Sequence, residues 1–301
     1  IIPVNVLSLP QHTNYRTNNT AQFGRKALEH HSVFLFPYEF TQGTIADGPE
    51  TGMEYPMIIF NGSSLGVTVH EFGHEWFPMM VGSNETRYGF MDEGWATTFE
   101  YLIGVSDMSK AKETNFYRQF RVNRWIHDPS PAEDLPIITP EDVLEPQAYG
   151  NNAYGKPSLG YLALKDLLGD AQFKKGLHAF MDRWHGKHPI PWDFFNTMND
   201  VTGRNLNWFW NSWFFSNAYI DLAVKSVSKS TGGYSVVLDN VGGMPAPVDL
   251  VLGFSDGSTS SVHATPAIWE ANHARATVRV PARKTLSSLR LDHPIWMDAD
   301  M

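Results

Sequence analysis

The periodicity of apolar residues changes near Asp221, and this change limits the possible folds more than any other feature of the sequence. Between residues 109 and 220, apolar side chains recur at three- and four-residue spacing, which is typical of amphipathic helices. After Asp221 the segments are short, alternate apolar with polar residues and end in Gly-rich breaks, as strands do. The sequence therefore predicts an α+β chain in which a mainly helical part is followed by a small β-sandwich of about six or seven strands.

The same patterns place the individual elements. Residues 1–10 are predicted to form a lone strand, and residues 11–20 a polar connector. A buried strand is expected at 55–60, and the boundary before the sandwich at about 220–223. Helices are expected over residues 21–31, 65–81, 92–103, 110–126, 154–169 and 171–184, and through the aromatic cluster 208–215.

Composition excludes several classes of function. The net charge of -9 argues against an electrostatic nucleic-acid partner, and no run of about 18 apolar residues predicts a membrane span. No signal-like targeting segment is recognisable, so a cytoplasmic location and a periplasmic or secreted one both stay open. The oligomeric state is equally open. Because the chain has no cysteine, thiol catalysis is excluded and any metal must be held by His and carboxylate side chains.

One segment carries the pattern of a metal site. The sequence LGVTVHEFGHEWFPMMVG contains His70 and His74 four residues apart, so on a helix both imidazoles face the same side and can reach one ion. Glu71 lies beside them and can act as general base on a water molecule. A catalytic zinc site takes three protein ligands, and the candidate for the third is Glu93, which eighteen residues separate from His74 and which opens the next predicted helix.

The alternative is a chance match on a helix whose polar residues face solvent. The predicted helix is apolar nearly all round, which indicates burial, and burying two histidines and a glutamate without strong partners costs several kcal/mol. We therefore favour the metal site. The remaining motif-like histidines are predicted to be surface or cap residues: His30, His31, His185 and His188.

With its flanking segments, this motif resembles the zinc-aminopeptidase family of gluzincins, which includes the alanyl and leucyl aminopeptidases and the leukotriene hydrolase. The matching segments are HExxH followed by Glu93, TGMEYP at 51–56 in place of the family's G-x-M-E-N, and AYGNNAYGKPSLGY at 148–161. The resemblance implies a thermolysin-like catalytic domain, one zinc ion per chain held by His70, His74 and Glu93, and peptide substrates with a free N-terminus.

The resemblance also implies roles for other residues. Glu71 would activate water and Tyr154 would stabilise the oxyanion, while Glu54, with Gly52 and Met53, would bind the substrate and its α-amino group. Asp92, Glu100 and Tyr149 are candidates for supporting the metal ligands from outside. The sequence departs from the family pattern at Thr51, Tyr55, Glu75, Pro78 and Pro157, none of them a predicted ligand or base.

The resemblance divides the chain into three regions. Residues 1–20 would be the remnant of a preceding β domain, 21–222 the peptidase domain and 223–301 the β-sandwich. Because family members carry a large N-terminal β domain, we expect the chain to be a fragment or a minimal version with a more open cleft. Two alternatives to an aminopeptidase stay open at this point: an endopeptidase that uses the open cleft, and a catalytically silent binding scaffold.

Overall fold

A computed structural model of the chain describes residues 1–107, 110–126, 134–292 and 294–300. Its N-terminal part contains a four-stranded sheet with the order β1-β2-β4-β3, in which β1, β2 and β4 are parallel and β3 runs antiparallel to β4. The strands are β1 (Val4–Leu7), β2 (Gly43–Ala46), β3 (Gly52–Tyr55) and β4 (Ile58–Asn61). The prediction of a lone strand at 1–10 was wrong, because β1 pairs with β2 from Val4↔Gly43 to Leu7↔Ala46.

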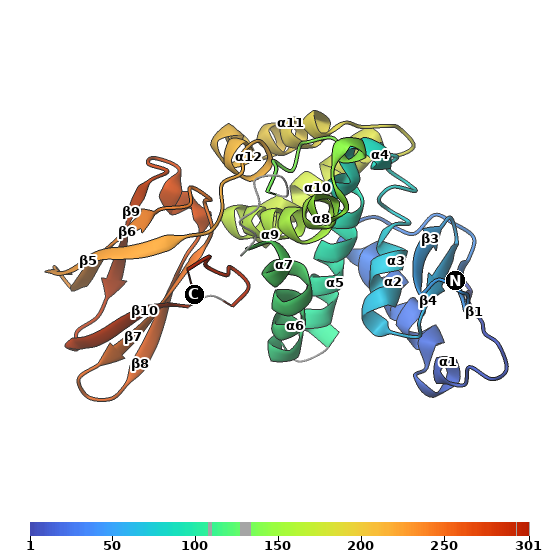
Figure 1. The fold of residues 1–301 in the computed structure, drawn as a ribbon, viewed down its shortest axis with the longest axis horizontal. Coiled ribbons are helices and arrows are strands. Elements are labelled where there is room, and N and C mark those ends of the chain that lie inside the picture. The colour runs from blue at the N-terminus through green and yellow to red at the C-terminus, as the bar shows by residue number, and fades with distance from the viewer. Residues whose placement is uncertain (108–109, 127–133, 293, 301) are drawn as a thin grey trace.

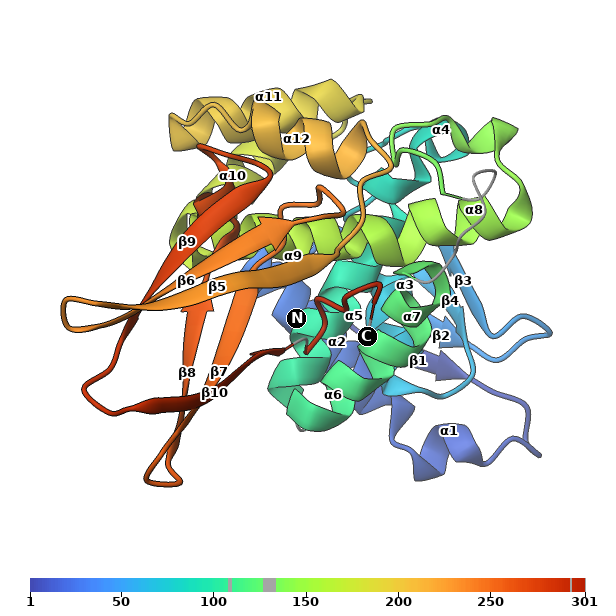
Figure 2. The same cartoon turned by 60° about the vertical axis from the view of Figure 1, so that its left-hand side comes forward.

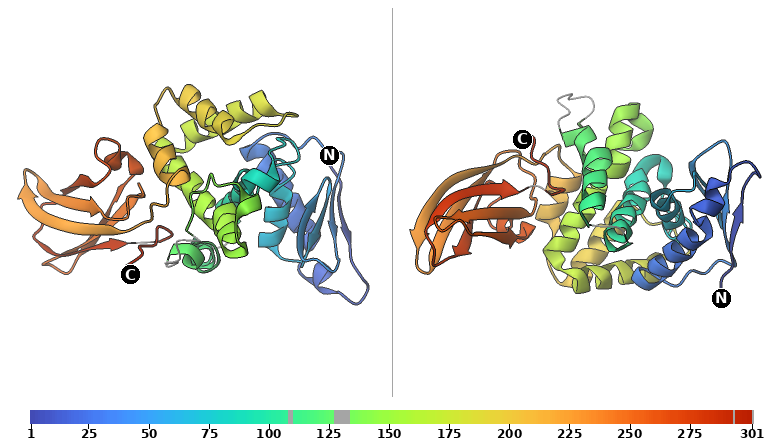
Figure 3. Two further views of the ribbon diagram at one scale, coloured as in Figure 1. Left: turned by 45° about the horizontal axis from the view of Figure 1, so that its top comes forward. Right: turned by 90° about the horizontal axis from the view of Figure 1, so that it is seen from below.

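Two helices pack on this sheet, as Figures 1 and 3 show. They are α2 (Thr20–Phe34), which contacts β1 and β2, and α3 (Leu65–Gly73), which contacts β3 and β4. On α2 the buried positions Gly24, Ala27, Leu28 and His31 follow helical spacing, so a single face of the helix enters the core. The short helix α1 (Asn14–Thr17) precedes α2.

Helix α3 is shorter than predicted. The Ser64 side chain accepts a hydrogen bond from the Val67 N–H at its N-terminus, but the regular helix ends at Gly73 and turns follow as far as residue 80. Proline 78 explains the difference, because it has no N–H to donate to the His74 carbonyl; the Met79 N–H bonds that oxygen instead, at 3.0 Å. His74 is therefore the cap residue of α3 and still follows His70 by one turn.

A helical layer follows, built around α5 (Glu93–Asp107), which packs against α3, α6 and α9. Its aromatic core includes Trp95, which stacks on Tyr161 with ring centroids 3.8 Å apart. No described helix is long and apolar enough to cross a membrane. The other helices are α4 (Glu85–Tyr88), α6 (Lys110–Tyr117), α7 (Asn123–Ile126), α8 (Pro146–Gly150), α9 (Lys156–Leu168), α10 (Asp170–Trp184), α11 (Pro191–Thr202) and α12 (Asn207–Phe214), with π-helical turns at Arg118–Val122 and Asn151–Gly155 and 3-10 turns at Gly89–Met91 and Glu141–Val143.

The C-terminal part is a sandwich of two three-stranded antiparallel sheets, β5-β6-β9 and β10-β7-β8 (Figure 2). Alternate residues of β6 and β7 are buried, among them Val236, Leu238, Leu250 and Leu252, because the inner faces of the two sheets share one core. The strands are β5 (Leu222–Ser230), β6 (Gly233–Asn240), β7 (Val248–Phe254), β8 (Thr259–Ala264), β9 (Arg275–Pro281) and β10 (Leu286–Asp292), with a 3-10 turn at Pro266–Trp269. The predicted α+β class, with helices followed by a β-sandwich, is confirmed.

Candidate active site

The packing of α3 against α5 brings the three predicted metal ligands together. His70 lies in the last turn of α3, His74 caps that helix and Glu93 is the first residue of α5. His70 Nε2 lies 2.9 Å from Glu93 Oε2, and His74 Nε2 lies 3.5 Å from the same oxygen. One donor atom from each of the three residues falls within 4.8 Å of the other two, so one ion can touch all three.

The state of these donor atoms fits a metal ion. His74 Nε2 is buried and makes no hydrogen bond to the described residues, although an unpaired buried nitrogen is costly. The opposite ring nitrogen of each histidine faces a carboxylate: His74 Nδ1 bonds Asp92 Oδ1, and His70 Nδ1 lies 3.5 Å from Glu100 Oε2. Metal-binding imidazoles usually have such an outer carboxylate, which fixes the ring and its tautomer.

The metal-binding histidines and Glu93 shift one another's pKa values toward their charged forms. Burial lowers the pKa of His70, but the nearby carboxylates of Glu100 and Glu93, which favour the protonated ring, outweigh this effect and raise the pKa to about 9. Burial raises the pKa of Glu93, but its close contacts with His70 and His74 outweigh this effect and hold the pKa well below the usual value. Glu93 therefore stays anionic and able to bind a cation.

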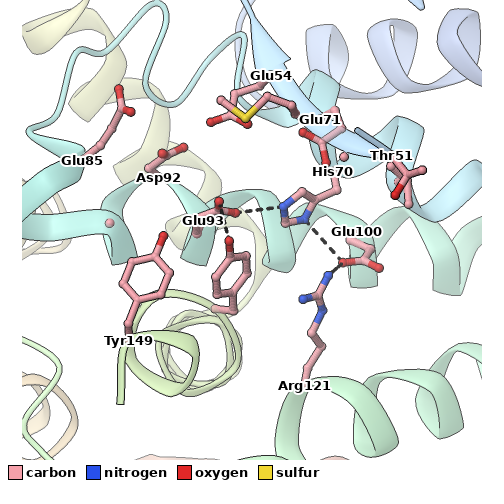
Figure 4. Close-up of a pocket in the computed structure, with 15 residues that line it drawn as sticks. Thr51, Glu54, His70, Glu71, Glu85, Asp92, Glu93, Glu100, Arg121 and Tyr149 are labelled. Atoms are coloured by element: carbon pink, nitrogen blue, oxygen red, sulfur yellow. Dashed lines mark hydrogen bonds and ion pairs between the residues drawn. The ribbon is translucent and has the colours of Figure 1, made fainter. Parts of the chain in front are cut away.

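Glu71 has the surroundings of a general base. It is 6% exposed and lines the cavity next to the metal-binding residues (Figure 4), and its carboxylate forms no hydrogen bond or ion pair among the described residues. Burial raises the pKa of Glu71 to about 7, which places its proton exchange near neutral pH. Strand β3 passes close to it: a Cβ atom on Gly52 would lie 3.0 Å from Glu71 Oε1.

Tyr154 lies next to both Glu93 and His70. Its phenol donates a 2.8 Å hydrogen bond to Glu93 Oε1, and its ring stacks on that of His70 with centroids 6.2 Å apart. The π-helical turn Asn151–Gly155 holds it there, close to Arg121: a Cβ atom on Gly155 would lie 1.7 Å from the Arg121 carbonyl oxygen. Burial and the charge of Glu93 raise the pKa of Tyr154, so the phenol keeps its proton.

A cavity of about 590 Å³ joins these residues. Nearly all the predicted site residues line it, while His74 lies behind the others at 0% exposure. The predicted residues on its wall are Gly52, Met53, Glu54, His70, Glu71, Asp92, Glu93, Glu100, Tyr149 and Tyr154.

Two charged residues of the cavity were missed by sequence reasoning. Arg121 pairs with Glu100 Oε2 at 2.5 Å, and its guanidinium lies 5.7 Å from the Tyr154 ring centroid. Glu85, the first residue of α4, enters from the opposite side. Neither belongs to a motif, and nothing in the sequence distinguishes Arg121 from the other basic residues of 110–126.

The four histidines predicted to be surface or cap residues, His30, His31, His185 and His188, do not line this cavity. The prediction for His31 was wrong: it is 1% exposed, stacks on Trp76, and burial lowers its pKa to about 3. His31 lies one helical turn after Ala27 on the buried face of α2, so it enters the core together with the rest of that face. His185 is a partly exposed partner of Glu39 at 2.8 Å, and His188 Nδ1 bonds the Gly82 carbonyl.

Two imidazoles and a carboxylate beside an unpaired carboxylate form the donor set of a metal-dependent hydrolase. Comparison with known proteins agrees with this class. The profile of the Peptidase family M1 domain matches residues 60–213, just over half of the 301 residues. The chain belongs to peptidase family M1.

Individual relatives are distant. The chain is 23% identical to human glutamyl aminopeptidase over 176 residues, which are 55% of this chain and 18% of that protein. It is 23% identical to aminopeptidase N of Lactococcus lactis subsp. lactis over 163 residues, 51% of this chain and 18% of the relative. The chain thus spans about a fifth of the length of these curated relatives.

The fold has counterparts among solved structures. An M1 zinc metallopeptidase from Deinococcus radiodurans superposes with a TM-score of 0.53 at 21% sequence identity, covering 64% of this chain and 42% of that one. At 21% sequence identity, this similarity is evidence for a shared fold only.

Proposed function

We propose that the chain carries the catalytic part of a zinc-dependent aminopeptidase, which hydrolyses the N-terminal peptide bond of peptides with a free N-terminus. One observation carries the proposal: the donor atoms of His70, His74 and Glu93 converge beside the unpaired carboxylate of Glu71. Membership of peptidase family M1 supports peptide hydrolysis as the reaction. In this proposal residues 21–222 supply the chemistry and residues 223–301 form a separate sandwich domain.

His70, His74 and Glu93 would hold one zinc ion. A bound zinc ion would supply Lewis acidity, which makes water more acidic and a peptide carbonyl more electrophilic. Asp92 and Glu100, on the outer sides of the two imidazoles, would keep both rings aimed at the ion.

The protein's own groups would then move the protons. Glu71 would accept a proton from the attacking water and pass it to the leaving amine, a transfer that its pKa of about 7 suits. Tyr154, whose raised pKa keeps it protonated, would donate its phenolic hydrogen to the substrate oxygen as negative charge develops there. Glu54 on β3 lines the same cavity and would pair with the substrate's ammonium group, which makes the activity that of an aminopeptidase.

The test compares an aminoacyl anilide that has a free amine with its N-acetylated twin, with and without a chelator. We expect cleavage of the free-amine compound alone, lost with the chelator and restored by zinc. Equal cleavage of both compounds would indicate an endopeptidase. A binding scaffold would be indicated by two results together: neither compound is cleaved, and the protein holds less than about half an equivalent of zinc even after zinc is added.

A further inference from the structure

Three carboxylates converge at one side of the cavity, next to the predicted metal ligands. Glu54 comes from β3, Glu85 from α4, and Asp92 directly precedes α5. One oxygen from each lies within 4.8 Å of the other two. Figure 4 shows these three side chains gathered on one side, with Glu71 and His70 beside Glu54.

This spacing suits an ammonium nitrogen. An –NH₃⁺ group has three N–H donors in tetrahedral directions, and charge-assisted bonds to carboxylate oxygens are about 2.8 Å long. Three acceptors placed at that distance around a tetrahedral nitrogen are about 4.6 Å from one another, again from the length of a charge-assisted bond. The oxygens of Glu54, Glu85 and Asp92 therefore lie within the separation that one ammonium group can bridge.

The charge of the cavity also calls for a cation at this side. Six carboxylates line the wall against one guanidinium, that of Arg121, so the acidic groups outnumber the cationic ones even beside a bound divalent metal ion. Burial and the neighbouring charge of Glu54 raise the pKa of Glu85, as expected where carboxylates repel one another.

Two buried carboxylates face the same space. Glu71, 6% exposed and without a hydrogen bond or ion pair among the described residues, has an oxygen within 4.8 Å of Glu54. Asp92 is 3% exposed, and its Oδ1 is bonded to His74 Nδ1. A substrate amine held at this side would therefore lie next to Glu71, the proposed general base, and one hydrogen bond away from the metal ligand His74. The first peptide bond of the substrate would then lie close to Glu71 and the metal site.

We propose that Glu85 and Asp92 complete, with Glu54, a three-acceptor site for the primary α-ammonium group of the substrate. The inference rests on the proposed aminopeptidase function and names its substrate class: peptides whose N-terminus is a primary amine, in preference to secondary N-termini. A secondary ammonium has two N–H donors and leaves one carboxylate unpaired. Glu85 is thus a substrate-binding residue, and Asp92 contacts both the substrate and a metal ligand.

The test uses Glu85→Gln, which keeps the shape of the side chain and removes its charge. The matched control is Glu29→Gln on α2, a carboxylate whose side chain is 61% exposed and outside the cavity. Steady-state kinetics are measured with a free-amine aminoacyl anilide. Binding is measured by calorimetry in the Glu71→Gln background, which does not turn the ligand over, with Ala-Ala-Ala-amide and its N-methyl and N-acetyl forms.

We expect Glu85→Gln to raise KM and weaken binding of Ala-Ala-Ala-amide about tenfold, with kcat reduced less than threefold, because one charge-assisted bond is lost in a partly exposed site. The preference for the primary over the N-methyl peptide should shrink, binding of the N-acetyl peptide should not change, and Glu85→Asp should recover part of the loss. Circular dichroism spectra and melting temperatures verify folding.

Three results would overturn the inference. The first is a Glu85→Gln protein that matches Glu29→Gln in KM and in binding. The second is absence of binding of Ala-Ala-Ala-amide in the Glu71→Gln background. The third is a second equivalent of zinc that Glu85→Gln abolishes, which would assign the carboxylates to a metal. Because calorimetry needs no turnover, a protein that binds the free-amine peptide but cleaves nothing contradicts the proposed function and leaves this inference standing.

Discussion

Replacement of Tyr154 by Phe separates the oxyanion role from the architecture of the site. The change removes one oxygen and keeps the ring that stacks on His70 at 6.2 Å, so the metal-binding residues should stay in place. The phenol now bonds Glu93 Oε1 at 2.8 Å, and the substrate oxygen would compete for the same donor. Loss of one donor to a developing oxyanion costs about 3–4 kcal/mol, so kcat should fall by about 10² to 10³.

The assay is steady-state hydrolysis of a free-amine aminoacyl anilide, with zinc content measured on the same samples. Tyr149→Phe is the control, because Tyr149 lines the cavity and packs edge-on against Tyr154, and the structure gives it no hydrogen bond to Glu93. We expect Tyr149→Phe to lose less than about tenfold in kcat, since it removes no donor from the reacting oxygen. A Tyr154→Phe protein with full zinc and more than half of the wild-type kcat would refute the assignment.

Two further predictions concern stability. His263 on β8 bridges Asp249 at 2.8 Å and Asp166 of α9 at 3.0 Å. Burial lowers the pKa of His263, but its interactions with the two carboxylates outweigh this effect and raise the pKa. The bridge therefore stabilises the fold at low pH, and this contribution disappears as the pH rises through the raised pKa. His263→Gln should therefore lower the melting temperature at about pH 5 and leave it unchanged at about pH 9. The loss of unfolding free energy at pH 5 should not exceed about 1 kcal/mol, because the side chain is 45% exposed. An equal loss at both pH values would contradict this prediction. Gly155→Ala places a Cβ 1.7 Å from the Arg121 carbonyl and should destabilise the fold by about 3 kcal/mol and lower kcat, whereas Gly150→Ala, with nothing within 4 Å, should melt like the wild type; similar unfolding curves for the two variants would show that the turn adapts.

Local sequence patterns predicted much of the fold, and they also predicted which three residues would bind a metal ion. The alternation after Asp221 determined strands, because each strand buries one face in the sandwich, and the structure contains six of them there. The spacing of His70 and His74 depends only on helical geometry, which survives the early end of α3 at Gly73. Local signals failed where the partner is distant in sequence: β1 was predicted to stand alone although it pairs with β2, and His31 was placed at the surface although Trp76 covers it.

Tertiary structure decided the rest of the site. The sequence alone determined the α+β class and the residue types able to bind a metal, because both follow from periodicity and from side-chain chemistry. The two charged residues it did not reveal, Glu85 and Arg121, enter the cavity from α4 and from the π-helical turn after α6. Only the packing of these elements around α3 and α5 brings Glu85 to Glu54 and Arg121 to Glu100, since such contacts depend on how separate elements meet and leave no repeat in the sequence.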